Sequence, residues 1–191
     1  VFSESFSGSF DEINWRNCSS SKIIVSPGIS SLRPFIKEIE GNEVRELDLF
    51  CENFQGEVVV ITGTNGKSSL TSQLGSLLKN KFSEQDVFVG GNLEPAAFEV
   101  FKAERLPKIA VLEVSSYQAE RLKTSQFDLG LLTNLGPDHF DRYLSQEDYY
   151  QAKWNLLSRC EQVLYPRDYL FSKKSEVELE SSLSSVQYLQ S

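Results

Sequence analysis

Short runs of aliphatic residues alternate with segments of helical periodicity along most of this chain. The run Val58–Ile61 consists of four consecutive β-branched residues, which is typical of a strand buried on both faces of a parallel sheet. The segment 68–80 places Leu70, Leu74, Leu77 and Leu78 on one helical face. Similar patterns predict strands at 22–25, 87–89, 109–112, 127–133 and 163–165, helices at 32–40, 95–105 and 146–159, and a short strand or helix within 44–54.

This order of elements predicts the fold class. Strands that alternate with helices at these lengths are joined by right-handed crossovers and form a mainly parallel sheet. We therefore expect an α/β protein with helices on both faces of the sheet. The first 21 residues and the residues after Asp168 show no clear periodicity, and they receive no functional interpretation.

Composition narrows the class of protein. The chain has 191 residues, of which 40% are hydrophobic and 24% are charged, as expected for one ordinary globular domain or one domain with a remnant of another. The net charge of −8 argues against a nucleic-acid-binding surface, and no apolar run approaches the length of a membrane span. The three widely spaced cysteines, Cys18, Cys51 and Cys160, favour reduced thiols and a cytoplasmic location. Because the sequence contains no methionine, even at its start, we expect it to be part of a longer protein.

The clearest chemical motif follows the Val58–Ile61 strand directly. The sequence Thr-Gly-Thr-Asn-Gly-Lys-Ser-Ser (62–69) joins that strand to the 68–80 helix, which is the context that a phosphate-binding loop requires. Its two glycines allow the backbone to approach phosphate oxygens closely, with N–H groups pointing inward and the helix dipole behind them. The usual P-loop pattern has a glycine where this sequence has Ile61. An ordinary turn between strand and helix is the weaker interpretation.

The residue types in this loop indicate a nucleotide triphosphate with Mg²⁺. Lys67 supplies a full positive charge for the β- and γ-phosphates, and the Ser68 hydroxyl is placed to bind Mg²⁺. We expect the nucleotide to be bound by Gly63, Thr64, Asn65, Gly66, Lys67, Ser68 and Ser69.

Two further motifs follow predicted strands, at the edge where parallel sheets bind ligands. Glu113 ends the strand at 109–112 and is a natural Mg²⁺ ligand, with a solvated carboxylate as the alternative. The serines at 115 and 116 could cap a helix or contact a ligand, and for Ser116 the two interpretations are equally favoured. The other motif, Thr133 to Tyr143, contains the only histidine, His139, for which a metal or phosphoryl contact and a structural role are evenly balanced. Spacing alone makes Lys153 an ordinary helical lysine in a surface salt bridge.

Taken together, these segments resemble the ATP-dependent Mur ligases of bacterial peptidoglycan synthesis. The resemblance rests on 63–69, 90–92, 112–118, 134–143 and 150–153, and residues 26–29 and 48–51 resemble the end of the family's N-terminal domain. The Ser-Ser-aromatic-Gln form of the second motif and the Ser-Pro-Gly-Ile segment favour the family member that adds D-glutamate to a nucleotide sugar. The fold that this implies is the P-loop-containing central domain of the family.

The resemblance also implies roles for single residues. Lys67 would hold the β- and γ-phosphates, and Lys67, His139 and Lys153 would be the catalytic set. One Mg²⁺ would be bound by Ser68 and Glu113, and a second by His139 and a carbamylated Lys153. The nucleotide-sugar substrate would lie along Asn92, Ser115 and Gln118. Its carboxylate would attack the γ-phosphate of ATP, and the amine of D-glutamate would displace phosphate from the acyl phosphate to form an amide.

A complete ligase of this family has three domains. The resemblance makes residues 1–54 the remnant of an N-terminal, Rossmann-like UDP-binding domain and residues 55–191 an incomplete central ATP-binding domain, with no C-terminal domain in this sequence. We therefore expect the chain alone to be inactive and the full-length enzyme to be a cytoplasmic monomer. Two alternatives stay open: a folylpolyglutamate synthase or sister Mur ligase, and a nucleotide-binding module without ligase activity. Glu113, His139 and Lys153 together argue against the second alternative.

Overall fold

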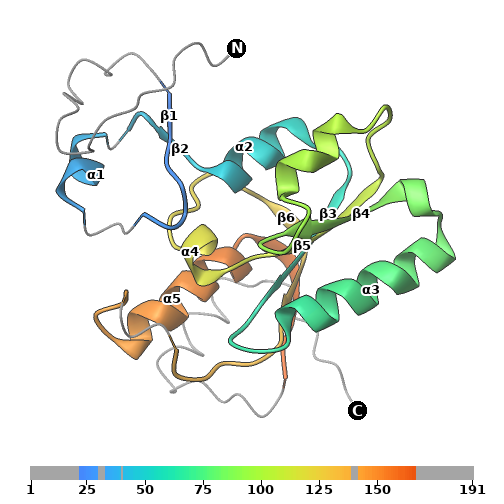
Figure 1. The fold of residues 1–191 in the computed structure, drawn as a ribbon. Helices are drawn as coiled ribbons and strands as arrows, with labels where there is room; N and C mark the ends of the chain where they lie inside the picture. The colour runs from blue at the N-terminus through green and yellow to red at the C-terminus, as the bar shows by residue number, and fades with distance from the viewer. Residues whose placement is uncertain (1–21, 30–32, 40, 139–141, 167–191) are drawn as a thin grey trace. The chain divides into compact units, whose positions relative to one another are not determined.

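The computed structural model describes residues 22–29, 33–39, 41–138 and 142–166 (Figure 1). The chain divides into two compact units, with the division after Glu46.

The first unit is small and is built on a pair of short parallel strands. β1 (Ile23–Ile24) pairs with β2 (Glu43–Val44), and α1 (Pro34–Glu38) lies between them in sequence. Val25, Ile36 and Ile39 form its core. The strand expected at 22–25 and the helix expected at 32–40 are therefore present in shorter form. β2 was not predicted, because two residues carry no periodicity.

A five-stranded parallel sheet forms the centre of the second unit. The strand order is β4-β5-β3-β6-β7, and every neighbouring pair is parallel. The strands are β3 (Glu57–Thr62), β4 (Val87–Gly91), β5 (Ile109–Glu113), β6 (Phe127–Leu132) and β7 (Cys160–Leu164). The helices are α2 (Glu46–Asn53), α3 (Lys67–Lys81), α4 (Ser116–Ala119) and α5 (Gln146–Leu157), with 3₁₀ turns η3 (Glu84–Asp86) and η4 (Ala97–Lys102). The predicted α/β class and parallel sheet are confirmed.

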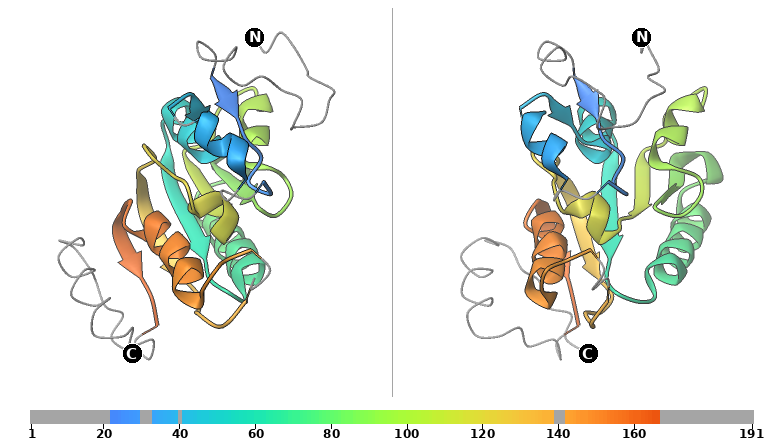
Figure 2. Two further views of the ribbon diagram at one scale, coloured as in Figure 1. Left: turned by 90° about the vertical axis from the view of Figure 1, so that its left-hand side faces the viewer. Right: turned by 60° about the vertical axis from the view of Figure 1, so that its left-hand side comes forward.

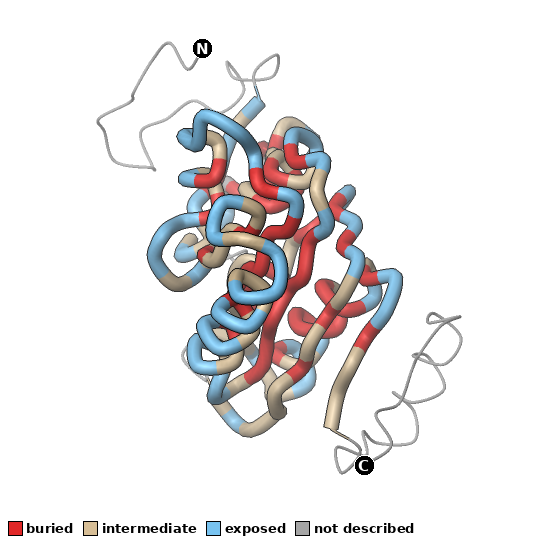
Figure 3. Tube along the Cα trace, turned by 90° about the vertical axis from the view of Figure 1, so that its right-hand side faces the viewer, coloured by how far each residue is buried: buried red, intermediate tan, exposed pale blue. Residues whose placement is uncertain are grey.

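Helices cover both faces of this sheet, as expected. In β3 the side chains alternate, so that Val59 and Ile61 pack with the leucines of α3 while Val58 and Val60 join the larger core on the other face. Residues of α2, η4, α4 and α5 complete that larger core. Figure 2 shows α3 and α5 on opposite sides of the sheet, and Figure 3 shows the central strands buried along their length.

Two elements differ from their prediction. The helix expected at 95–105 is the 3₁₀ turn η4, which begins only at Ala97. Its buried side chains, Ala97 and Val100, and its paired rings, Phe98 and Phe101, are each three residues apart. A 3₁₀ helix brings positions i and i+3 into line, so this spacing suits it better than an α-helix. β7 begins at Cys160 rather than at residue 163, because Cys160 itself packs in the larger core.

In the described part of the chain, no helix is long and apolar enough to cross a membrane. Cys51 and Cys160 are free thiols there, as expected, and Cys18 lies outside the described residues. Burial raises the pKa of Cys51 to about 11 and that of Cys160 to about 12, so both thiols stay protonated at neutral pH.

Candidate functional site

Apart from Lys153, which lies in α5, the predicted site residues follow the carboxyl ends of four adjacent strands, β4, β5, β3 and β6. β3 lies between β5 and β6, and Glu113 at the end of β5 is in register with Ile61 near the end of β3. Backbone hydrogen bonds continue past the strands, from Val114 N to Ile61 O at 2.9 Å and from Thr133 N to Thr62 O at 2.9 Å. The chain segments that leave these strands therefore start side by side at one edge of the sheet.

The loop after β3 has the geometry that its glycines predict. Gly63 has φ 144° and Gly66 has φ 79°, a region that other residues rarely adopt. α3 begins at Lys67, and its N-cap residue Gly66 provides no side-chain hydrogen bond. Because the first N–H groups of a helix lack partners within the helix, this end of α3 is open to an anion and carries the positive end of the dipole.

Two residues after β6 hold this loop in place. The side-chain amide of Asn134 binds both backbone groups of Asn65, accepting from its N–H at 2.9 Å and donating to its C=O at 2.9 Å. The Asn134 carbonyl accepts from Thr64 N at 3.0 Å, and the Thr133 hydroxyl donates to Asn65 O at 2.7 Å. The motif from Thr133 to Tyr143 includes this Thr-Asn pair, but the sequence alone assigned the pair no role. A polar pair directly after the strand beside a phosphate loop is the signal that could have found it.

Two lysines share one carbonyl oxygen of the loop. Lys67 Nζ donates to Gly63 O at 3.0 Å and to Thr64 O at 2.9 Å, while Lys153 Nζ donates to Gly63 O at 2.9 Å. Lys153 is 2% exposed, so the surface salt bridge that spacing alone favoured is wrong. Burial, and then the positive charge of Lys67, lower the pKa of Lys153 to about 7 against the opposing effect of Asp138.

Tyr149 connects Lys153 to the same loop. Lys153 Nζ lies 4.5 Å from the centre of the Tyr149 ring, and the Tyr149 hydroxyl lies 3.3 Å from Thr64 Oγ1. Thr64 Oγ1 also accepts from Gly136 N at 2.9 Å. Tyr149 is buried, and it was not among the predicted site residues because helical periodicity marks it only as apolar.

Glu113 is arranged as a cation ligand would be. Its side chain is 3% exposed, so the solvated carboxylate considered above is wrong. Oε1 accepts from Asn92 Nδ2 at 2.7 Å, and Oε2 is buried with no hydrogen-bond partner among the described residues. A buried carboxylate oxygen without a partner is costly, and a metal ion would remove that cost. Ser68 lies exposed at the start of α3.

The described residues contain no group of three or more His, Cys, Asp or Glu side chains that could hold a metal. His139 lies outside the described residues, whereas its neighbour Asp138 is described.

Ser115 and Gln118 form the N-terminal cap of α4. Ser115 Oγ accepts from Gln118 N at 3.3 Å, and Gln118 Oε1 accepts from Ser115 N at 3.0 Å, which completes a capping box. The capping role thus belongs to Ser115, and Ser116 is buried behind it. The box fixes Gln118 beside the carboxyl end of β5.

Comparison with known proteins agrees with this geometry. A family model described as the Mur ligase middle domain matches residues 61–186. UDP-N-acetylmuramoylalanine–D-glutamate ligase of Hydrogenovibrio crunogenus is 36% identical over 150 residues, which are 77% of this chain and 33% of that protein. The ligase of the same name from Aquifex aeolicus is 40% identical over 137 residues, 70% of this chain and 32% of that protein. The chain thus spans about a third of the length of these relatives.

Solved structures agree on the fold. A crystal structure of MurF ligase from Thermotoga maritima in complex with ADP superimposes with a TM-score of 0.55 and 21% identity, covering 74% of this chain and 34% of that one. Since the family model matches more than half of the residues, this chain belongs to the Mur ligase family, whose middle domain it contains.

Proposed function

We propose that this chain is the nucleotide-binding part of an ATP-dependent ligase that joins D-glutamate to UDP-N-acetylmuramoylalanine in peptidoglycan synthesis. The observation that carries the proposal is the convergence of Lys67 and Lys153 on Gly63 O, beside the strand that ends in Glu113. The two relatives described above bear the name of this ligase, which supports the choice of substrates.

The phosphate loop binds ATP. The β- and γ-phosphates of ATP lie against the N-terminal end of α3, within the stretch Gly63–Ser69. Lys67, which donates to Gly63 O and Thr64 O in this structure, turns its ammonium group to the phosphates instead. The negative net charge of the chain does not prevent this, because Lys67 and the helix dipole act at short range while distant charges are screened by salt.

The buried Glu113 oxygen that has no partner among the described residues supports a Mg²⁺ site beside the loop. Glu113 and Ser68 would hold one ion, and His139 with a carbamylated Lys153 would hold a second. When bound, Mg²⁺ offsets the repulsion between a carboxylate and a triphosphate. For Lys153 the carbamate forms when the neutral amine attacks CO₂: an N–C bond is made and one proton leaves the nitrogen. A buried amine with a pKa of about 7 is largely neutral at slightly alkaline pH, which favours this reaction.

The nucleotide sugar lies along Asn92, Ser115 and Gln118. Its carboxylate attacks the γ-phosphorus of ATP, the bond to ADP breaks, and an acyl phosphate forms. The amine of D-glutamate then attacks the acyl carbon and expels phosphate. Lys67 stabilises the charge that spreads over the transferred phosphoryl group. In domain terms, we assign residues 1–54 to a UDP-binding domain and residues 55–191 to the ATP-binding domain.

The test is phosphate release by the full-length protein with ATP, Mg²⁺ and the nucleotide sugar, measured against a panel of amino acids. D-glutamate should give the fastest release. Faster release with L-glutamate and a folate, or with the amino acid of a sister ligase, would identify one of those enzymes instead. Release without dependence on any amino acid would favour a nucleotide-binding module.

A matched pair of variants tests the site itself. Lys67→Met should lower kcat/KM at least about 100-fold, as expected for loss of a charged group that stabilises the transition state. Lys79→Met, near the far end of the same helix, removes a lysine that pairs with Glu84 and should leave kcat/KM unchanged. Equal effects of the two substitutions would contradict the assignment of Lys67.

A further inference from the structure

α4 is a single helical turn that other elements must hold in place. It contains only Ser116–Ala119, and so short a helix is not stable by itself in water. At its start the capping box of Ser115 and Gln118 satisfies backbone N–H groups. The carbonyl groups at its end, and those of the loop toward β6, need partners from elsewhere.

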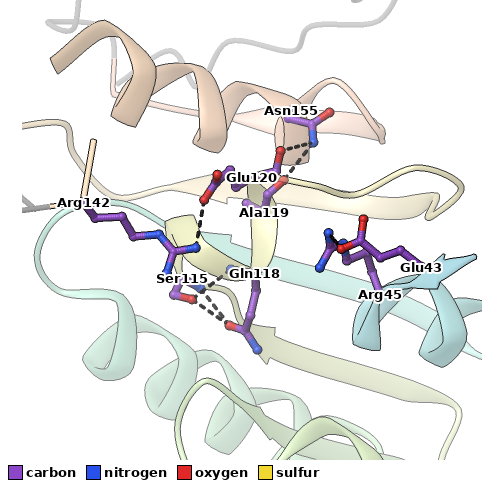
Figure 4. Close-up of polar contacts among 8 residues, drawn as sticks. All are labelled: Glu43, Arg45, Ser115, Gln118, Ala119, Glu120, Arg142 and Asn155. Carbon is purple, nitrogen blue, oxygen red and sulfur yellow. Dashed lines mark hydrogen bonds and ion pairs between the residues drawn. The ribbon is translucent and has the colours of Figure 1, made fainter. Parts of the chain in front are cut away.

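Two side chains of the α5 region supply these partners. Asn155 Nδ2 donates to Ala119 O at 2.8 Å, and more weakly to the carbonyl oxygens of Glu120 and Leu122, each at 3.4 Å. The Arg159 guanidinium donates to Leu122 O at 2.8 Å and to Lys123 O at 2.7 Å. Figure 4 shows the Asn155 amide directed at the end of α4, while the capping box closes its other end.

The same helix also reaches the phosphate loop. Lys153 precedes Asn155 by two positions, and residues two apart lie on different sides of a helix. Lys153 Nζ therefore contacts Gly63 O at 2.9 Å while Asn155 holds Ala119 O at 2.8 Å. α5 is thus a rigid link between the loop that would bind ATP and the turn that carries Ser115 and Gln118.

We infer that Asn155 and Arg159 are positioning residues, which fix α4 relative to the phosphate loop and so set the affinity for the nucleotide sugar rather than that for ATP. This inference rests on the proposed function, which places the nucleotide sugar against Ser115 and Gln118. ATP binding does not depend on Asn155 or Arg159, because the loop is held by Thr133 and Asn134 instead.

The experiment compares three variants of the full-length ligase. Asn155→Leu removes the donor at a similar side-chain size, and Arg159→Lys keeps the charge but loses the forked pair of donors. Ser76→Ala is the control, since the Ser76 hydroxyl also donates to a backbone carbonyl, that of Ser72 at 2.9 Å, on the exposed side of α3. For Asn155→Leu, KM for the nucleotide sugar should rise about tenfold, the effect of one to two lost hydrogen bonds, with KM for ATP within about twofold. Arg159→Lys should give a smaller rise, and the control none.

Hydrogen exchange provides a readout independent of activity. In Asn155→Leu the amides of Ala119 and Glu120, which bond to Ser115 O and Ser116 O, should exchange about tenfold faster, while the Leu70 amide of α3 should not change. Unchanged exchange, or a parallel rise of both KM values, would overturn the inference in an active enzyme. An inactive wild type would instead overturn the proposed function and, with it, the substrate assigned to α4.

Discussion

Gly63 is the more confined of the two glycines in the phosphate loop. A Cβ atom at this position would lie 1.9 Å from Thr133 Oγ1 and 3.1 Å from the backbone of Asn134. Gly66 also has positive φ, yet a Cβ atom there would meet nothing within 4 Å. The two glycines therefore serve different purposes: Gly66 allows a conformation, and Gly63 allows a close approach of two chain segments.

This difference predicts unequal costs of alanine. Gly66→Ala should lower the free energy of unfolding by about 1 kcal/mol, the cost of a left-handed residue with a side chain. Gly63→Ala should cost at least about 3 kcal/mol, because Thr133 and Asn134 must move as well, and the displaced loop should bind ATP more weakly. Urea unfolding of the chain measures both changes in the free energy of unfolding. Calorimetric titration with ATP measures the loss of affinity in Gly63→Ala. Equal costs at the two positions would refute this account of the loop.

Lys153 can be tested by a change that keeps its charge. Lys153→Arg retains a cation but cannot form a stable carbamate, so the full-length enzyme should lose about 100-fold or more in kcat. Wild-type activity should rise as pH increases through about 7, since the amine must lose its proton before it reacts with CO₂. The pH–rate profile and labelled bicarbonate followed by carbon NMR are the measurements. An arginine variant with full activity would show that the positive charge alone is sufficient.

At the scale of elements, one carboxylate joins α2 to the loop before β6. Asp48 is 5% exposed and accepts from the backbone N–H of Lys123, Thr124 and Ser125, the last at 2.8 Å, and from the Ser125 hydroxyl. Burial alone would raise the pKa of Asp48. Hydrogen bonds from the side chain and backbone of Ser125, and from the backbone N–H groups of Thr124 and Lys123, outweigh burial, so the pKa of Asp48 is lowered. The charged form of Asp48 therefore stabilises the fold.

The hydrogen bonds to Asp48 predict that part of the chain's stability is lost at low pH. Because the pKa of Asp48 is lower in the folded chain than in the unfolded chain, its stabilisation is complete above the unfolded value of about 3.9 and is lost as pH falls through the folded value. Asp48→Asn should cost about 2 kcal/mol at pH 7 and progressively less below pH 4. The measurement is urea unfolding at pH 7 and below pH 4. The control is Glu52→Gln, because Glu52 is exposed on the same helix. A cost that does not depend on pH would contradict this account.

The elements also show how far the sequence could predict this structure. The β3 strand, its loop and α3 were predicted because a β-branched run, two glycines and a leucine pattern all indicate the same arrangement. The 3₁₀ turn η4 was not, because its spacing of three also occurs in α-helices. The burial of Lys153 against Gly63 O depends on how α5 packs across the sheet. Periodicity within one helix contains no information about that packing.

At the scale of the whole molecule, the proposed phosphate site lies at one edge of the central sheet. We assign no amino-acid pocket among the described residues. The middle-domain model matches 61–186, and the relatives are about three times as long as the part that aligns. Under the proposed function, the described residues would bind the phosphates, the metal and part of the nucleotide sugar. We therefore expect D-glutamate to be recognised by residues outside the aligned part of those relatives.

We therefore expect the 191-residue chain alone to bind a nucleotide weakly and to form no amide. Positioning both reactants supplies much of an enzyme's rate, and a chain that holds only one of them forgoes that contribution. Product formation from labelled D-glutamate should be undetectable for this chain under conditions where the full-length protein turns over, while calorimetric titration with ATP and Mg²⁺ should still give a signal that Lys67→Met abolishes. Measurable amide formation by the isolated chain would mean that its own residues bind the amino acid. A signal that persists in Lys67→Met would place the nucleotide away from the loop.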